Sequence, residues 1–207
     1  MRLSPVVLQG ALVRLEPLES RHFDAILAAA LSDPAIWTHI PYRVRDRADV
    51  ERLFALAARL HAAESAVVFA TCAGPDWCVV GSTSIRISDP DTPSIEIGGT
   101  WIVPQCQRTR VNTEAKFLQL THCFETLGMA RVELKTDARN ARSRAAILRL
   151  GASFDGVLRA HKVAADGGVR DSAFYSMLAS EWPAARERLV ARLDQLVAAS
   201  SADSMSA

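Results

Sequence analysis

The stretch between Trp101 and Lys116 has the residue types and spacing of an anion-binding turn. An apolar strand stops at Pro104, a polar turn follows, and Asn112 or Thr113 is suited to cap a helix. The first N–H groups of a helix lack partners within it and carry the positive end of its dipole, so they attract a negative group. The basic side chains expected beside that anion are Arg108, Arg110 and Lys116. The pattern predicts a phosphate-bearing ligand, although an ordinary capped helix with solvated basic residues is the alternative.

Two other places combine residue types that suit a site. Gly98 and Gly99 interrupt the strand before the turn, and glycine inside a strand marks a bulge or a close approach of another backbone. A plain kink at a sheet edge is the alternative there. Asn140 and Ser143 begin a helix that is closed by Gly151, and both residue types cap helix N–H groups well.

A loop predicted at 35–45 carries Trp37, His39 and Tyr42 close together. Aromatic rings with polar tips suit the wall of a substrate pocket. Trp37 and Tyr42 fit equally well as cover for the hydrophobic core, an interpretation that we prefer for Trp37. The role of His39 stays open at this point.

Composition narrows the class of protein. The chain has 207 residues, enough for one domain with a substantial core, and a net charge of +1, which gives no general attraction to nucleic acid or membrane surfaces. No apolar run is long enough to span a bilayer and the N-terminus lacks a signal-peptide core, so a cytoplasmic location is expected. The four cysteines form no Cys-x-x-Cys pair and the five histidines lack ligand spacing, so no metal site is predicted.

Residue periodicity predicts the elements that must position these side chains. Alternating or continuous apolar patterns predict strands at 12–18, 66–71, 77–87, 94–103, 131–136, 154–163 and 169–178. Apolar stripes predict helices at 20–31 with Ser20 as cap, at 49–63, from the turn towards 127, and before Gly151. Turns at 73–76 and 166–168 predict antiparallel hairpins. We therefore expect a single domain at 1–183, a helix at 184–198 and a disordered tail at 199–207.

These features together resemble acetyltransferases of the GNAT superfamily, over roughly residues 12–183. Gln107 matches the start of the Gln/Arg-x-x-Gly-x-Gly/Ala loop that holds the diphosphate of acetyl-CoA in that superfamily. Arg110 and Asn112 stand where small residues are usual, so either the loop uses ordinary backbone angles or Arg110 reaches a phosphate. Strings that resemble the RimJ/RimL branch of ribosomal-protein N-acetyltransferases are Val-Asn-Thr-Glu-Ala-Lys at 111–116, Gly-Val-Leu-Arg at 156–159 and Ser-Glu-Trp-Pro at 180–183.

The resemblance implies a fold and a cofactor. The fold is α/β (α+β), with a mixed, mostly antiparallel central sheet, helices on both faces and an opening where the fourth and fifth strands splay. The pantetheine arm of acetyl-CoA lies in that opening, where N–H groups at Gly98 and Gly99 are candidates to polarise the thioester carbonyl. The acetyl-CoA-binding residues expected are Trp101, Ile102, Val103, Gln107, Arg108, Thr109, Arg110, Val111, Asn112, Thr113, Asn140 and Ser143. The acceptor-site residues expected are Trp37, His39, Tyr42, Gly98 and Gly99.

By the same resemblance, the chain transfers an acetyl group from acetyl-CoA to a primary amine. Direct attack in a ternary complex needs no covalent enzyme intermediate, because holding both substrates together removes much of the entropic barrier. Glu96 and His161 are the candidates for the general base. The donor to the CoA thiolate is Ser143, which the motif favours, or Tyr175, which acidity favours.

Alternatives to this function remain at the level of sequence. A catalytically weak acyl-CoA-binding sensor would keep the loop but lack a base. A nucleotide-binding domain is disfavoured, because neither Gly-x-Gly-x-x-Gly nor a Gly-Lys-Ser/Thr loop is present. The acceptor is a small-molecule amine or a protein N-terminus, between which the sequence does not choose, and a homodimer is left open.

Overall fold

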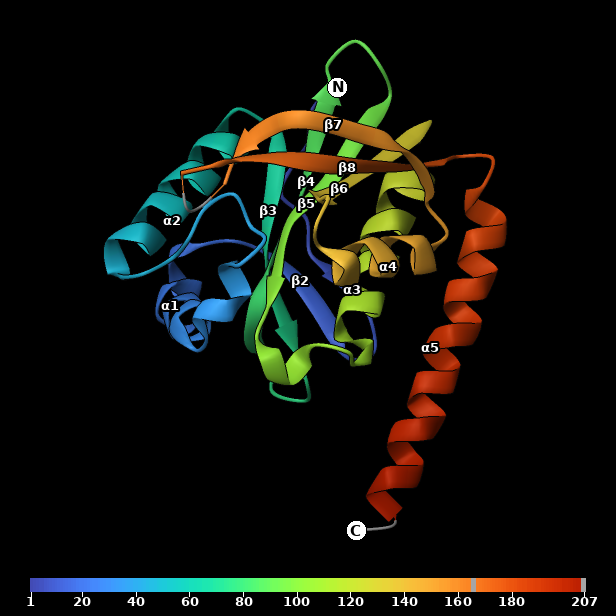
Figure 1. Cartoon of the computed structure of the whole chain (residues 1–207). Coiled ribbons are helices and arrows are strands. Elements are labelled where there is room, and N and C mark those ends of the chain that lie inside the picture. The colour runs from blue at the N-terminus through green and yellow to red at the C-terminus, as the bar shows by residue number, and fades with distance from the viewer. Residues whose placement is uncertain (165–166, 206–207) are drawn as a thin grey trace.

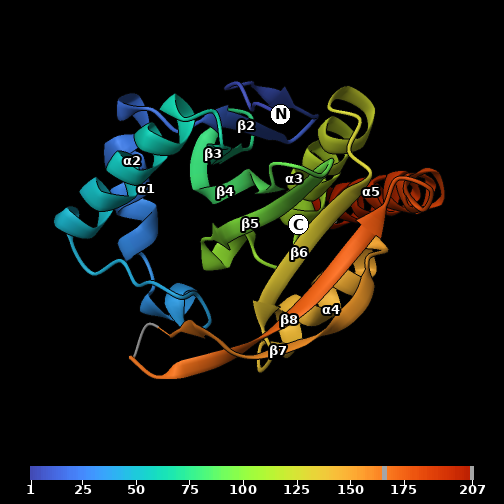
Figure 2. The ribbon, with the colours of Figure 1, turned by 90° about the horizontal axis from the view of Figure 1, so that it is seen from above.

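A computed structural model describes residues 1–164 and 167–205, with 199–205 described as backbone alone. Its centre is an eight-stranded sheet with the strand order β1-β2-β3-β4-β5-β6-β8-β7 (Figures 1 and 2). All neighbouring strands are antiparallel except β5 and β6, which run parallel. The strands are β1 (Leu8–Gln9), β2 (Val13–Pro17), β3 (Ala66–Ala73), β4 (Cys78–Asp89), β5 (Ser94–Ile102), β6 (Arg131–Asp137), β7 (Ser153–Val163) and β8 (Val169–Leu178).

Helices cover both faces of this sheet, with α1 and α2 on one side and α3, α4 and α5 on the other (Figure 2). The mixed, mostly antiparallel sheet between helices confirms the predicted fold class. The helices are α1 (Phe23–Leu31), α2 (Arg47–Ala62), α3 (Arg110–Thr121), α4 (Ala141–Leu150) and α5 (Trp182–Met205). Short helical segments are η1 (Ser20–His22), η2 (Pro34–Trp37), η3 (Pro104–Cys106) and the π-helical turn η4 (His122–Thr126).

Each face of the sheet has its own hydrophobic core. Ile97 and Trp101 of β5 would share a face in a regular strand, but the register with β4 shifts by one residue between them, so β5 supplies Ile97 to one core and Trp101 to the other. Ile97 packs in the cluster that contains Leu120 of α3 and Ile147 of α4. Trp101 packs in the cluster that contains Ile26 of α1. β5 therefore contributes to both cores, as β3 does with Phe69 and Val68.

Helix starts differ most from the sequence prediction. The helix expected from Ser20 begins as the turn η1, which is capped by Glu19. The helix expected from Asp49 begins two residues earlier, because Asp46 Oδ1 accepts the Asp49 N–H at 2.9 Å. Hydrophobic periodicity locates a helix but does not select its cap, which accounts for these shifts.

The C-terminal part combines the β7–β8 hairpin with α5, which extends away from the body of the molecule (Figure 1). α5 runs from Trp182 to Met205, against a helix predicted at 184–198. Residues 206–207 of the predicted tail and Asp166 of the predicted turn lie outside the described residues. Neither α5 nor any other helix in the described part of the chain combines the length and apolarity needed to cross a membrane.

The parallel strands β5 and β6 stay together for only three register positions. Their pairing runs from Ser94 opposite Arg131 to Glu96 opposite Glu133, although both strands continue beyond it. β5 remains paired with β4 on its other edge as far as Ile102. The sheet therefore opens between β5 and β6 after Glu96, as predicted.

Candidate active site

β5 carries a bulge beside this opening. Two of its residues, Gly99 and Thr100, lie opposite Thr83 of β4 alone, and Gly99 has a φ of +60°, which glycine adopts at little cost. The carbonyl of Gly98 accepts a hydrogen bond from Ser84 Oγ of β4 at 3.1 Å. The C=O and the following N–H of a trans peptide point in opposite directions. The Gly99 N–H is therefore directed away from β4, towards the opening.

The carboxylate of Glu96 lies at the start of the opening. A Cβ added to Gly98 would be 2.6 Å from Glu96 Oε1, so the carboxylate covers this glycine. Its other oxygen accepts a hydrogen bond from Lys135 Nζ of β6 at 2.7 Å. The ion pair joins the two strands where they separate and holds the carboxylate beside the bulge.

His161, the other base candidate, lies on β7. Its ring is 5.2 Å from that of Phe174, and its Nδ1 is 3.0 Å from Ser172 Oγ. Burial lowers the pKa of His161, and the positive charges of Lys162 and Lys135 lower it further. These effects favour the neutral imidazole, which is the form that can accept a proton. Both base candidates thus lie on the same face of the sheet, with Lys135 near each.

The turn between β5 and α3 is capped by Thr109, not by Asn112 or Thr113 as predicted. Thr109 Oγ1 accepts the Val111 N–H at 3.2 Å and donates to the Cys106 carbonyl at 2.8 Å. Asn112 and Thr113 lie inside the helix, one turn further on. The N–H groups without partners inside the helix consequently begin at the start of α3, closer to β5 than expected.

Three basic residues were expected to face this turn, and the structure separates them. Arg108 is exposed and has a φ of +63°, so the loop keeps a left-handed residue without a glycine. Arg110 forms an ion pair with Glu114 at 2.9 Å. Lys116 is buried and donates to the sheet instead of the turn, which contradicts the prediction. Arg108 is therefore the one of the three that is exposed to a ligand in the turn.

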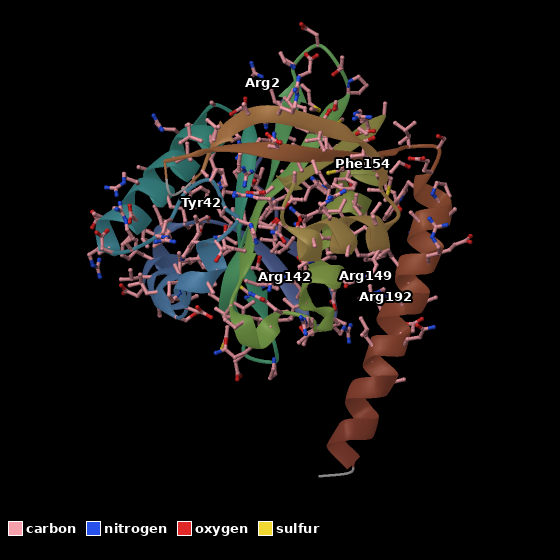
Figure 3. All side chains as sticks on the ribbon, in the orientation of Figure 1. Arg2, Tyr42, Arg142, Arg149, Phe154 and Arg192 are labelled. Atoms are coloured by element: carbon pink, nitrogen blue, oxygen red, sulfur yellow. The ribbon has the colours of Figure 1, made fainter. Side chains whose placement is uncertain are left out.

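Gln107 connects this turn to the start of α4. Its Nε2 donates to the Ile102 carbonyl at 3.1 Å, and its Oε1 accepts a hydrogen bond from Arg142, which is labelled in Figure 3. At the same end of α4, Asn140 Oδ1 accepts the Ser143 N–H at 3.0 Å. The two segments expected to bind acetyl-CoA thus lie side by side, and the capping role of Asn140 is observed.

The two candidate thiolate donors have different surroundings. Ser143 is half-buried in the first turn of α4. Tyr175 is 1% exposed in the core below α4, where its hydroxyl accepts a hydrogen bond from Arg144 Nε at 2.9 Å. Its ring packs against Phe154 at 5.3 Å. The contacts of Tyr175 are those of a core residue, whereas Ser143 is partly exposed at the start of α4.

The loop before α2 lies on the other face of β5. Trp37 is fully buried and donates to the Ala30 carbonyl at 3.0 Å, with its ring 5.1 Å from Trp101 and 5.7 Å from Tyr42 (Figure 3 labels Tyr42). Trp37 is therefore a core residue. Burial raises the pKa of Tyr42 to about 12, partly offset by the positive charge of Arg86.

His39 is held by the C-terminal hairpin. Its backbone carbonyl accepts a hydrogen bond from Arg170 Nη1 of β8. Within the described residues, the buried atoms His39 Nδ1, Arg170 Nε and Trp101 Nε1 have no hydrogen-bond partner. Because buried polar groups are normally paired, these unpaired nitrogen atoms beside the loop before α2 mark a place where a ligand or water can complete the bonding.

Sequence reasoning missed several of these residues. The ion pair of Arg110 with Glu114 was missed, although the i,i+4 spacing of the two residues in a predicted helix could have indicated it. The burial of Lys116 follows from its position one turn before Leu120, on the apolar face of α3. No local signal indicated Lys135 or Arg170, because their partners come from other strands and loops.

A cluster of potential metal ligands also forms, at Glu16, His22 and Cys72, whose ligand atoms lie within 4.8 Å of one another. The carboxylate of Glu16 already forms ion pairs with Arg14 and Arg21 and a 3.0 Å hydrogen bond with His22. Burial raises the pKa of the Cys72 thiol to about 11. Two guanidinium groups on one carboxylate make this cluster an ion-pair network around the buried Glu16.

Comparisons with known proteins agree with this geometry. A family model described as an acetyltransferase (GNAT) domain matches residues 13–153. The structure is similar to that of a GCN5-related N-acetyltransferase from Brucella melitensis, with 31% identity, a TM-score of 0.84 and coverage of 93% of this chain and 87% of that chain. Mycobacterium smegmatis RimJ in complex with CoA-disulfide shares the fold, with 24% identity, a TM-score of 0.78 and coverage of 91% and 95%. Comparison with curated proteins gives no match. The domain match and the 31% identity over nearly the whole chain show that the protein belongs to the GNAT acetyltransferase family.

Proposed function

We propose that the protein transfers an acetyl group from acetyl-CoA, the donor that its family uses, to a primary amine by direct attack in a ternary complex. The observation that carries this proposal is the opening between β5 and β6 with the Gly99 bulge beside it. An extended pantetheine arm fits between two strands that have stopped pairing, because each strand then offers backbone groups to it.

The diphosphate of acetyl-CoA is expected at the start of α3. Unpaired N–H groups and the helix dipole favour a negative group there, and the exposed Arg108 adds positive charge. The contact between Gln107 and Arg142 brings the start of α4 near this turn, which supports our expectation that Asn140 and Ser143 contact the pantetheine.

The thioester carbonyl is expected to accept a hydrogen bond from the Gly99 N–H. Negative charge develops on this oxygen as the amine attacks, and a donor already aimed at that position lowers the barrier. Glu96 lies beside the same bulge and is our choice of general base, acting on the amine directly or through one water. His161 is the second candidate, in its neutral form.

The acceptor is expected on the face that carries Glu96 and the loop around His39. The unpaired Arg170 Nε, together with His39 Nδ1 in the tautomer that carries its proton there, suits an acceptor that carries oxygen atoms close to its amine, as a peptide N-terminus or an amino acid does. Ser143 is the proposed donor to the departing thiolate, and Tyr175 contributes to the core.

The test is a screen of acceptor amines for release of the free CoA thiol. Peptides with free N-termini, amino acids, aminoglycosides and polyamines are each added with acetyl-CoA, and Glu96→Gln is the control. We expect at least one amine to raise thiol release well above the acceptor-free rate. If acetyl-CoA raises the melting temperature but no amine raises thiol release, the protein is an acyl-CoA-binding sensor instead.

A further inference from the structure

A lysine without a carboxylate partner is buried between α3 and the sheet. The side chain of Lys116 reaches three neutral oxygens, and its Nζ lies 2.8 Å from Thr83 Oγ1, 2.7 Å from Thr100 Oγ1 and 2.8 Å from Gln119 Oε1. No ion pair of Lys116 occurs in the described part of the chain. Burial lowers the pKa of Lys116 to about 7.

Such a lysine opposes stability. Removing an ammonium from water costs free energy that three neutral acceptors return only in part, and apolar residues of similar volume often replace buried charges without loss. The position of Lys116 on α3, one turn from Leu120, would suit an apolar side chain. The presence of a lysine here therefore needs an explanation other than stability of the core.

The partners of Lys116 are the residues that form the bulge. Thr100 is one of the two bulged residues of β5, and Thr83 is the β4 residue that lies opposite them. Their hydroxyl oxygens are 2.8 Å apart. Both also lie near the Gly98 carbonyl oxygen, Thr83 Oγ1 at 3.4 Å and Thr100 Oγ1 at 3.5 Å.

The hydrogen bonds from Lys116 determine which acceptors these hydroxyl groups can donate to. An ammonium has three N–H donors and no acceptor, so its bonds to Thr83, Thr100 and Gln119 use all three. Each hydroxyl then accepts from Nζ and keeps its own hydrogen for another acceptor. The acceptors within reach are the other hydroxyl, the Gly98 carbonyl and, for Thr83, Gln119 Oε1 at 3.3 Å. The neutral amine still has two donors, so a link to a hydroxyl persists in both protonation states.

We infer that Lys116 is a positioning residue, which acts through the hydroxyl groups of Thr83 and Thr100 to hold the Gly98 carbonyl on the β4 side. The same peptide carries the Gly99 N–H on its opposite edge. Holding the carbonyl therefore aims this N–H into the opening between β5 and β6. The catalytic part of this inference rests on the proposed function, because it assigns the Gly99 N–H to the thioester oxygen.

The kinetic test compares Lys116→Met and Thr83→Val with Thr71→Val, a buried strand threonine away from the bulge. A misaimed transition-state donor lowers kcat more than substrate binding, so we expect Lys116→Met and Thr83→Val to lower kcat about tenfold or more, with little change in the KM of acetyl-CoA. Thr71→Val should leave kcat within about twofold. Thr100→Ser should retain activity that Thr100→Val loses, and this pair replaces Lys116→Met if that variant does not fold.

The second measurement is the amide resonance of Gly99 in the protein without ligand. We expect Lys116→Met, or Thr100→Val in its place, to shift this resonance while Gly74, in the distant β3–β4 turn, stays unchanged. An unshifted Gly99 resonance overturns the inference, whatever the kinetics. So does a folded Lys116→Met variant with wild-type kcat. If no amine supports turnover in the wild type, the proposed function fails while the Gly99 resonance still decides the positioning role of Lys116.

Discussion

The donor end and the acceptor end of this site are built differently. At the donor end, Thr109 and Asn140 cap their own helices, and Gln107 bonds the end of β5 a few residues away. At the acceptor end, His39 is held by Arg170, which is 131 positions away in the sequence, and both residues keep buried nitrogen atoms unpaired. These side chains of the donor end thus find partners within a few residues, whereas those of the acceptor end keep buried nitrogen atoms unpaired where specificity would be decided.

The largest effect on kcat is expected from substitution of Glu96, which lies between the donor end and the acceptor end. Positioned bases contribute about 10²–10⁴-fold, so Glu96→Gln should lower kcat at least about a hundredfold, and His161→Gln less than about tenfold. Steady-state kinetics with the best acceptor measures both, and Glu133→Gln on the paired part of β6 is the control. If His161→Gln lowered kcat more than Glu96→Gln, His161 would be the general base and the amine would have to react near β7.

Next in size is the contrast between Ser143 and Tyr175. Ser143→Ala should lower kcat and kcat/KM together, because a bond to the leaving thiolate exists only as the reaction proceeds. Tyr175→Phe should cost less than about tenfold in kcat, or about 1.4 kcal/mol of barrier, because it keeps the packing against Phe154. If Tyr175→Phe lowered kcat by more than about tenfold with unchanged CoA affinity, Tyr175 would be the donor to the thiolate.

A third prediction concerns pH and the buried Lys116 below the bulge. Its pKa is 10.5 in an unfolded reference and about 7 in the fold, so between these values the unfolded chain binds more protons. The free energy of unfolding should then rise with pH across this window, by at most about 1.4 kcal/mol per pH unit, and the contribution should be constant below it.

Urea unfolding of the wild type and Lys116→Met at several pH values isolates this term, because other groups cancel in the difference. Cys123, the titratable neighbour, has a pKa raised to about 12 by burial and stays protonated in the window. We expect the free energy of unfolding of the wild type to rise relative to that of Lys116→Met from pH 7 upwards. Parallel curves would mean that Lys116 titrates normally in the fold.

The smallest expected effects separate Arg108 from Arg110 at the donor end. Arg108→Ala should weaken CoA by about tenfold or less and leave pantetheine unchanged, because the lost contact is to a phosphate. Arg110→Ala should instead lower the melting temperature slightly, because it leaves the buried carboxylate of Glu114 without its ion pair. Calorimetric titration with CoA and with pantetheine measures the first effect. If both variants weakened CoA binding equally, Arg110 would also contact a phosphate.

Local residue patterns predicted a large part of this fold. The strands and hairpins follow from alternation, the end of α4 from Gly151 with its φ of +99°, and the bulge from Gly98 and Gly99. These features depend on backbone conformations that neighbouring residues set among themselves. The resemblance to the GNAT superfamily, and not these local patterns, indicated the loop before α3 and the start of α4 as one site. The local patterns placed the helix cap at Asn112 or Thr113, three or four residues too late, because Thr109 is also a good cap.

Only the tertiary structure decided which side chains face one another. Arg110 and Lys116 are both basic residues of α3, yet the first pairs with the buried carboxylate of Glu114 and the second is buried against β4 and β5. The ion pair of Glu96 with Lys135 exists because two strands separate at one residue. By itself the sequence determined the backbone of the site through local conformational preferences. Its charges were assigned by packing between distant segments, because a side chain's partner depends on which faces meet and not on its neighbours along the chain.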